Sequence, residues 1–168
     1  MSMSVAIENT VKTAESRAGK YLTFRLGREE FGIRVMQVRE IMGLLEITPV
    51  PHTPVHVKGV INLRGKVIPV VCLRSKFSLA PAEYTARTSI IVVQVDGGKL
   101  LAGVIVDAVS EVLNVAAGDI EDAPDFGSGS ETSYLLGMAK IKNSIKILLD
   151  IDQVVMASEL AALQSTSI

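Results

Sequence analysis

Several residue types on which common protein classes depend are scarce or missing in this chain. It has no tryptophan, and aromatic residues make up only 4% of its 168 residues. Its formal net charge of −1 gives no electrostatic reason to expect a nucleic-acid partner. A barrel that binds single strands needs stacking aromatic side chains and a basic groove. We therefore expect no nucleic acid among its partners.

The single cysteine and the absence of long apolar runs limit where the protein works. Cys72 alone cannot form a disulfide within the chain, which fits a reducing compartment. No apolar run reaches the roughly 18 residues of a membrane-spanning helix. The first residues carry charges, such as Glu8 and Lys12, without the apolar core of a secretory signal. We predict a cytoplasmic protein without direct membrane insertion, with a flexible leader over residues 1–19 and a tail over 157–168.

Motifs for catalysis and metal binding are missing as well. His52 and His56 flank Pro54 and have no cysteine or carboxylate cluster beside them, which leaves too few ligands for a metal. No serine lies in a Gly-x-Ser-x-Gly elbow, and Gly97-Gly98-Lys99 lacks the remaining residues of a phosphate-binding loop. An enzyme or a small-molecule module is thus the weaker alternative. We predict no catalytic residue, no cofactor and no metal.

Valine and isoleucine dominate what is present, with 36 residues between them. Both are β-branched, and their stiff side chains suit a pleated, half-buried surface. They gather in short runs separated by turn residues, as in antiparallel strands. The runs are Tyr21–Leu26, Phe31–Ile33, both halves of 58–74, Ser89–Val95, Leu100–Val106, Val109–Val115, Tyr134–Ile141 and Ile145–Leu149. So many short strands predict a mainly β protein built from small barrels, with only short helices.

Two segments have the spacing of helices, and one has the composition of a loop. Apolar residues at positions 35, 38 and 41 predict a helix over Val35–Met42. A C-terminal helix is predicted to begin at Ile151, since Asp150 and Gln153 have the spacing of a capping box. The stretch Gly118–Ser133 is acidic and rich in glycine and serine, which predicts a loop.

Residues 58–74, KGVINLRGKVIPVVCLR, are the most informative stretch of the sequence. Gly65 can adopt the positive φ of a tight turn, so the stretch predicts a hairpin with Arg64 at its tip. Pro69 lies inside the second strand and predicts an edge strand or a bulge there. A guanidinium fixed in this way is typical of recognition, and Glu40 is a natural partner for it. The alternative is that Glu40 and Arg64 are ordinary solvated surface charges.

Four runs in this order resemble the CheW-like family of bacterial chemotaxis coupling proteins. They are FRLGREEFGIRVMQVREIMG, VKGVINLRGKVIPVVCLRSKF, GVIVDAVSEVLNV and YLLGMAKIKNSIKILLDID. The resemblance extends from about Lys20 to Val155. Its most specific part is the hairpin, with Gly59, Asn62-Leu63-Arg64-Gly65 and Pro69.

The resemblance implies a fold and a role. It implies two small five-stranded β-barrels packed together over residues 20–156, with short helices, one of them C-terminal. It implies an adaptor without catalytic activity, cofactor or metal. Such an adaptor couples the cytoplasmic tips of chemoreceptors to the regulatory domain of the histidine kinase CheA, in arrays at the inner face of the membrane. The alternative is the scaffold of a non-flagellar chemosensory pathway.

The resemblance also implies two sets of binding residues. The receptor's helical hairpin is expected to dock in a groove between the barrels, with apolar anchors flanked by orienting charges. The receptor-binding residues carried over by motif are Val38, Glu40, Ile41, Gly59, Asn62, Leu63 and Arg64. The kinase-binding surface is assigned more loosely, around Phe31, Ile33 and Ile47.

Overall fold

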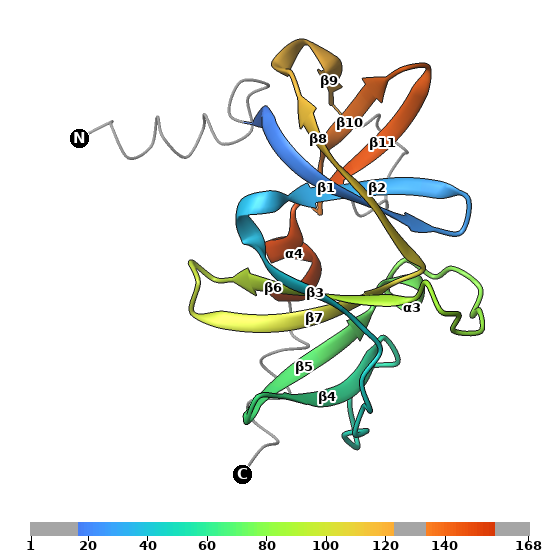
Figure 1. Ribbon diagram of the computed structural model, residues 1–168, viewed down its shortest axis with the longest axis vertical. Coiled ribbons are helices and arrows are strands. Elements are labelled where there is room, and N and C mark those ends of the chain that lie inside the picture. The colour runs from blue at the N-terminus through green and yellow to red at the C-terminus, as the bar shows by residue number, and fades with distance from the viewer. Residues whose placement is uncertain (1–16, 123–133, 157–168) are drawn as a thin grey trace.

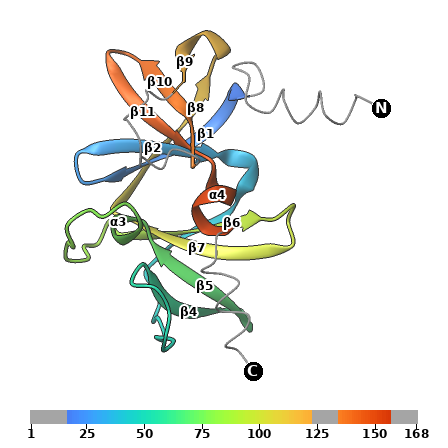
Figure 2. The same cartoon turned by 180° about the vertical axis from the view of Figure 1, so that it is seen from behind.

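The computed structural model describes residues 17–122 and 134–156 and shows two curled β-sheets stacked on each other (Figure 1). We call the six-stranded sheet the first layer and the five-stranded sheet the second layer. The strand order is β8-β1-β2-β11-β10-β9 in the first layer and β3-β6-β7-β5-β4 in the second. Figure 2 shows the same stack from behind, with the helix α4 between the layers.

The element bounds follow the runs of β-branched residues. The first layer contains β1 (Gly19–Leu26), β2 (Glu29–Arg34), β8 (Ala108–Val115), β9 (Ile120–Glu121), β10 (Leu135–Ile141) and β11 (Ser144–Leu149). The second layer contains β3 (Val38–Gly43), β4 (Val57–Leu63), β5 (Lys66–Cys72), β6 (Ser89–Val95) and β7 (Leu100–Val106). The short helices are η1 (Val35–Gln37), α3 (Leu73–Lys76), η2 (Ala117–Asp119) and α4 (Ile151–Met156).

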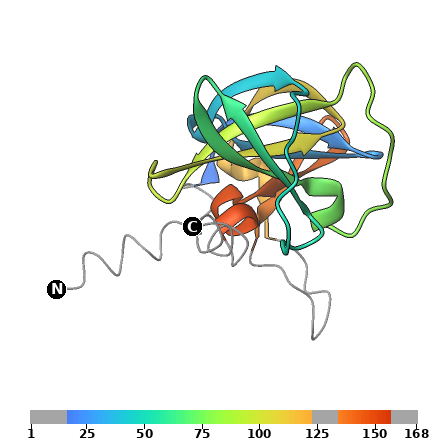
Figure 3. The same cartoon turned by 90° about the horizontal axis from the view of Figure 1, so that it is seen from below.

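Each layer has edge strands that are neighbours in the sequence. In the first layer a four-residue connection, 116–119, joins the edge strands β8 and β9. In the second layer the edge strands β3 and β4 are joined by residues 44–56, and Thr48 pairs with Val60 through two backbone hydrogen bonds of 2.9 Å. Seen from below, the strands of the second layer curve round toward each other (Figure 3).

Three apolar clusters show why the two layers stay together. The largest, the interlayer core, contains Phe24, Ile33, Val104 and Ile151 among others. A second cluster lies within the first layer. The third lies within the second layer, and we call it the second-layer core; it contains Ile61, Ile68, Val70, Ile90, Val92 and Ile105. Strand β6 alternates between two clusters, since Ile91 and Val93 lie in the interlayer core and Ile90 and Val92 in the second-layer core. A strand covered on both faces needs apolar residues throughout, which explains its sequence SIIVVQV.

The mainly β class and the two-layered β architecture are confirmed, while the strand count differs for one layer. The first layer has six strands instead of five because β9 adds a two-residue strand beside β10. This strand falls inside the stretch predicted as a loop, 118–133, of which residues 123–133 lie outside the described part. The predicted leader and tail also lie largely outside it.

The helix predicted over Val35–Met42 is wrong. Only η1 is helical, and β3 follows it directly and pairs with β6. The register shifts between Val38 and Glu40, so Arg39 is the extra residue of a β-bulge. Across the bulge the inward face changes: Val38 packs on the interlayer core, whereas Met42 packs on the second-layer core. Val35, Val38 and Met42 thus pack inward at i, i+3 and i+7, a spacing close to that of a helix, whereas Ile41 is 45% exposed.

Most other local predictions are confirmed. The hairpins β4–β5, β6–β7 and β10–β11 form at the expected turns. The helix α4 begins after Asp150, whose side-chain oxygen accepts the backbone N–H of Gln153 at 3.4 Å. Strand β5 is not an edge strand, but Pro69 precedes the segment Val70–Cys72 that pairs with β7. The part of β5 that holds Pro69 therefore has a neighbour on one side only, where a missing N–H is tolerated.

Candidate functional site

Glu40 and Arg64 form an ion pair between the two edges of the second layer. Glu40 lies on β3 and Arg64 in the turn between β4 and β5. Both terminal nitrogens of the guanidinium donate to the carboxylate, Nη2 to Oε1 and Nη1 to Oε2, the latter at 3.3 Å. The side chain of Arg64 is 71% exposed and that of Glu40 is 32% exposed. The pair is therefore a fixed, two-pronged feature at the surface.

The two charges stabilise each other's ionised form. The hydrogen bond from Arg64 lowers the pKa of the Glu40 carboxyl, and the same bond raises the pKa of the Arg64 guanidinium. Both groups are thus charged at neutral pH. Ion pairs this open to solvent add little to folding stability. Their value in an interface lies in orientation, association rate and discrimination between partners.

The backbone of the β4–β5 turn sets the place of Arg64. The ladder ends at the pair Leu63–Lys66, which leaves a two-residue turn. Arg64 has a φ of 52° and Gly65 a φ of 88°, and a type I′ turn requires positive φ at both positions. The side-chain oxygen of Asn62 accepts the backbone N–H of Gly65 at 2.7 Å. The sequence Asn-Leu-Arg-Gly thus encodes both the turn and a bond across it.

Besides Glu40 and Arg64, the five other predicted receptor-binding residues divide into three kinds. Ile41, which is 45% exposed, and Asn62 lie at the surface. In the sequence, Ile41 follows Glu40 and Asn62 is two residues before Arg64. Val38 and Leu63 are half-buried, against the interlayer core and the second-layer core respectively. Gly59 is buried and has no side chain, so it offers a partner no direct contact in this conformation.

The predicted kinase-binding residues are mostly core residues. Ile33 is fully buried and Phe31 nearly so, and both belong to the interlayer core. Phe31 also stacks between Phe24 and Phe77, at centroid distances of 5.9 and 5.8 Å. Ile47 is half-buried against the second-layer core. The side chains of Phe31 and Ile33 are therefore unavailable to a partner in this conformation, which corrects their assignment as surface contacts.

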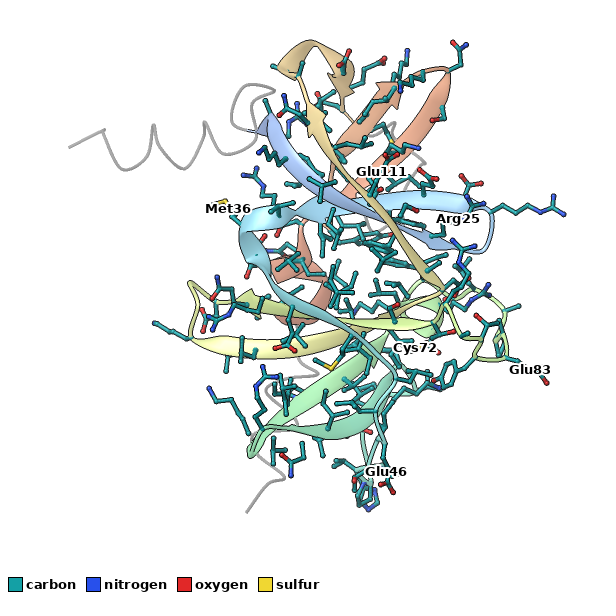
Figure 4. The ribbon with its side chains drawn as sticks, in the orientation of Figure 1. Arg25, Met36, Glu46, Cys72, Glu83 and Glu111 are labelled. Carbon is teal, nitrogen blue, oxygen red and sulfur yellow. The ribbon has the colours of Figure 1, made fainter. Side chains whose placement is uncertain are left out.

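A cleft between the layers contains residues that the sequence did not single out for binding. Its volume is about 550 Å³, and its walls come from η1, the β6–β7 turn, β10 and the start of α4. Met36 lies on it with a side chain that is 74% exposed and points away from the ribbon (Figure 4). The lining residues are Arg34, Met36, Gln37, Gln94, Gly97, Gly98, Leu136, Asp150 and Asp152.

Hydrogen bonds fix the polar wall of this cleft. Gln37 donates to a carboxylate oxygen of Asp152 at 3.0 Å, and the backbone N–H of Asp96 donates to the other at 2.8 Å. Burial raises the pKa of the Asp150 carboxyl. None of the predicted receptor-binding residues lines the cleft, but Gln37 precedes Val38 and so connects it to β3. An exposed methionine on a 3-10 helix has no recognisable sequence signal.

Within residues 17–122 and 134–156, no three His, Cys, Asp or Glu side chains come together in a group suited to a metal ion. In the same residues no helix has the length and apolar character needed to cross a membrane. The candidate site contains a pair of charges, exposed apolar side chains and a cleft, features that suit the recognition of a partner.

Comparisons with known proteins agree on one family. Residues 20–159 match the model of the CheW-like domain. The chain is 39% identical over 151 residues to the chemotaxis protein CheW of Rhizobium meliloti, covering 90% of this chain and 96% of that protein. It is 36% identical over 153 residues to the chemotaxis protein CheW of Klebsiella aerogenes, covering 91% of each.

A solved structure extends the agreement from sequence to fold. The crystal structure of the scaffolding protein TtCheW from Thermoanaerobacter tengcongensis superimposes with a TM-score of 0.74 at 33% identity. The match covers 82% of this chain and 92% of that one. A shorter similarity, 31% identity over 121 residues, links the chain to the protein FrzA of Myxococcus xanthus, covering 72% and 74% of the two.

Proposed function

The chain belongs to the CheW-like family and is thus a non-catalytic scaffold of chemotaxis signalling, and we propose that it couples transmembrane chemoreceptors to the histidine kinase CheA. In this role it binds the cytoplasmic tip of the receptor and the regulatory domain of the kinase. Recruitment to receptor arrays at the inner face of the membrane follows from the first of these contacts. Weak individual contacts suffice in an array because avidity multiplies them.

The Glu40–Arg64 pair is the observation that carries the receptor part of the proposal. A helical hairpin that docks on a protein surface needs apolar anchors and charges that fix its register. The pair supplies such charges, held in a two-pronged arrangement, and Ile41 next to it supplies an exposed apolar side chain. An exposed ion pair adds little to folding stability, so stability alone does not explain this two-pronged geometry.

The interlayer cleft supports a second part of the receptor contact. Met36 and Leu136 give it apolar lining, and Gln37 and Asp152 give it a fixed polar wall. The path from the cleft to Glu40 runs along η1 and β3, which are consecutive in the chain. We therefore propose that the receptor hairpin extends from the cleft along β3 to the ion pair.

For the kinase, the exposed apolar side chains of the second layer support a contact around Ile47. Leu45 and Val55 flank it in the connection between β3 and β4, and both are exposed. We therefore propose that the kinase binds the connection between β3 and β4, none of whose residues lines the interlayer cleft. Receptor and kinase could then be bound at once, as a coupling protein requires.

The receptor contact predicts a specific loss on mutation of the pair. We expect Arg64→Ala and Glu40→Lys each to reduce capture by receptor-bearing membranes by roughly tenfold, because each removes one half of the oriented charge pair. Co-sedimentation at several protein concentrations measures the capture. Swapping the charges, Glu40→Arg with Arg64→Glu, retains an ion pair but presents the wrong sign outward, so capture should stay low.

Lys140→Ala is a matched control for these variants. Lys140 is also an exposed cation in an ion pair, with Glu121, but it lies on the first layer. It should leave capture unchanged, and all variants should still bind the purified kinase regulatory domain. Wild-type capture by both Arg64→Ala and Glu40→Lys would reject the receptor site while leaving the scaffold role in place.

The alternative is a scaffold of a non-flagellar chemosensory pathway. It would use the same binding sites but control another output of the cell. The similarity to FrzA shows that proteins related to this chain extend beyond those named chemotaxis protein CheW. Deletion of the gene followed by separate assays of swimming and surface motility would distinguish the two outputs. Loss of swimming alone favours the leading proposal.

A further inference from the structure

We propose that Asn62 is a positioning residue of the receptor site, which acts through Arg64 and makes no receptor contact of its own. The inference rests on the proposed receptor contact and deepens it. The motif places Asn62 among the binding residues, but the structure uses its side-chain oxygen inside the turn, where it accepts the Gly65 N–H at 2.7 Å. This bond spans Leu63 and Arg64 and so restricts the conformation of Arg64, the first residue of the turn.

The bond favours a backbone conformation of Arg64 that is sparsely populated. Its φ of 52° is unfavourable for a residue that is neither glycine, asparagine nor aspartate. In a two-residue turn that ends at the pair Leu63–Lys66, the Gly65 N–H has no partner in the ladder. The Asn62 carboxamide supplies that partner and so favours the turn in which both Arg64 and Gly65 have positive φ.

The direction of the Arg64 side chain follows from this turn. A change of φ at Arg64 from positive to negative redirects its Cα–Cβ bond, and with it the guanidinium. Glu40 lies on the opposite edge strand, so the two-pronged contact depends on that direction. Loss of the Asn62 bond should therefore weaken the ion pair before it weakens the hairpin.

The β10–β11 hairpin shows that such a turn forms without the asparagine bond. Its two turn residues, Lys142 and Asn143, have φ values of 52° and 66°. The residue in the place of Asn62 is Lys140, which pairs with Glu121 instead. Among the described residues Lys142 makes no ion pair. Of these two hairpins, only β4–β5 has the side-chain bond across its turn, and only β4–β5 holds a turn residue, Arg64, in an ion pair.

The test combines a titration with a double mutant. In Asn62→Ala, we expect the pKa of the Glu40 carboxyl, followed by carboxyl-carbon NMR, to rise from its lowered value toward that of Arg64→Ala. Capture by receptor-bearing membranes should fall roughly threefold, the size expected from one turn hydrogen bond. The double variant Asn62→Ala with Arg64→Ala should capture no less than Arg64→Ala alone. Asn143→Ala is the control at the other turn and should change neither quantity.

Each outcome is decisive. An unchanged Glu40 pKa in Asn62→Ala overturns the inference, as does a further loss of capture when Asn62→Ala is added to Arg64→Ala, since that would show a direct contact. A raised Glu40 pKa together with unchanged capture in Arg64→Ala would uphold the positioning of Arg64 and reject the proposed receptor site instead. The Gly65 amide should exchange hydrogen more slowly in wild type and in Asn62→Asp, which keeps an acceptor oxygen, than in Asn62→Ala, and equal exchange in all three would overturn the inference.

Discussion

Gly59→Ala is expected to destabilise the protein by about 4 kcal/mol, the size typical of severe backbone and overpacking defects. A Cβ at this position would lie 2.0 Å from the carbonyl oxygen of Thr48 and 2.7 Å from its carbonyl carbon. Those atoms belong to backbone, so no side-chain rotation relieves the clash. The φ of 143° adds strain for any residue with a Cβ.

The clash falls on the contact between β4 and the connection that leads to it from β3. Thr48 pairs with Val60 through two backbone hydrogen bonds, and Gly59 makes room for that approach. Moving Thr48 away would break both bonds and open the connection between β3 and β4. Urea denaturation should therefore show a lower midpoint, and many molecules should be unfolded at 37 °C.

Gly118→Ala is the control for this prediction. An added Cβ there meets no atom within 4 Å, and the residue has no left-handed φ. Its stability should change by less than about 0.5 kcal/mol. A Gly59→Ala protein with wild-type stability but reduced receptor capture would contradict the structural account and restore Gly59 as a direct contact.

The local structure of this protein was largely predictable from sequence because its strands carry their own signals. Turn residues mark the hairpins, and unbroken Val and Ile runs mark strands such as β6. The bulge at Arg39 was not predictable in this way. A single inserted residue changes which face is buried, and periodicity then favours a helix over Val35–Met42 where the structure has mostly β3.

The candidate site depends on contacts between distant parts of the chain, which local sequence patterns do not predict. Hairpin rules place Arg64 at a turn, but they do not reveal that β3 and β4 are the two edges of one curled sheet. That closure brings Glu40 to Arg64 across 24 positions of sequence. Alternation with Gly32 puts Phe31 and Ile33 on one face of β2, but sequence does not show that the second layer covers that face. The family resemblance identified Glu40 as a site residue, which the apolar pattern alone could not do. It also assigned Phe31 to a binding surface, although the side chain of Phe31 is buried.

The second large effect concerns a contact that no sequence pattern indicated. Arg74 lies on α3, after the second-layer strand β5, and Asp107 lies where the chain crosses from β7 to β8. Arg74 donates to both oxygens of Asp107, from Nε at 2.8 Å and from Nη2 at 2.7 Å. The backbone N–H of Gly27, in the β1–β2 turn, donates to the same carboxylate at 2.8 Å. We call these three residues the interlayer clamp because they join the two layers.

Arg74→Met is expected to destabilise the protein by about 2 kcal/mol. The side chains of Arg74 and Asp107 are only 19% and 31% exposed, so removing the guanidinium leaves a poorly solvated carboxylate with one remaining donor. Methionine keeps the apolar stem, so the loss comes from the charge and the hydrogen bonds of the guanidinium. Asp107→Asn should cost somewhat less, because it leaves the hydrogen bond from Arg74 Nη1 to the carbonyl oxygen of Ala80, at 2.6 Å, in place. The double variant should lose less than the sum, because both changes weaken the same Arg74–Asp107 contact. Urea denaturation at pH 7 measures all three.

The free energy of unfolding that Arg74→Met loses should also depend on pH, and it should become smaller only on the acidic side. The hydrogen bond from Arg74 holds the pKa of the Asp107 carboxyl below its usual value, near 3.9 in unfolded chains. A lowered pKa in the folded state stabilises the protein above the unfolded pKa, and this contribution disappears as the pH falls through the folded pKa. The difference between wild type and Arg74→Met should therefore be constant near neutrality and shrink below about pH 4. Lys140→Ala, whose pair with Glu121 is more than half exposed on both sides, should show little loss at any pH. An Arg74→Met difference that persists undiminished to pH 2 would show that the clamp acts through packing and not through charge.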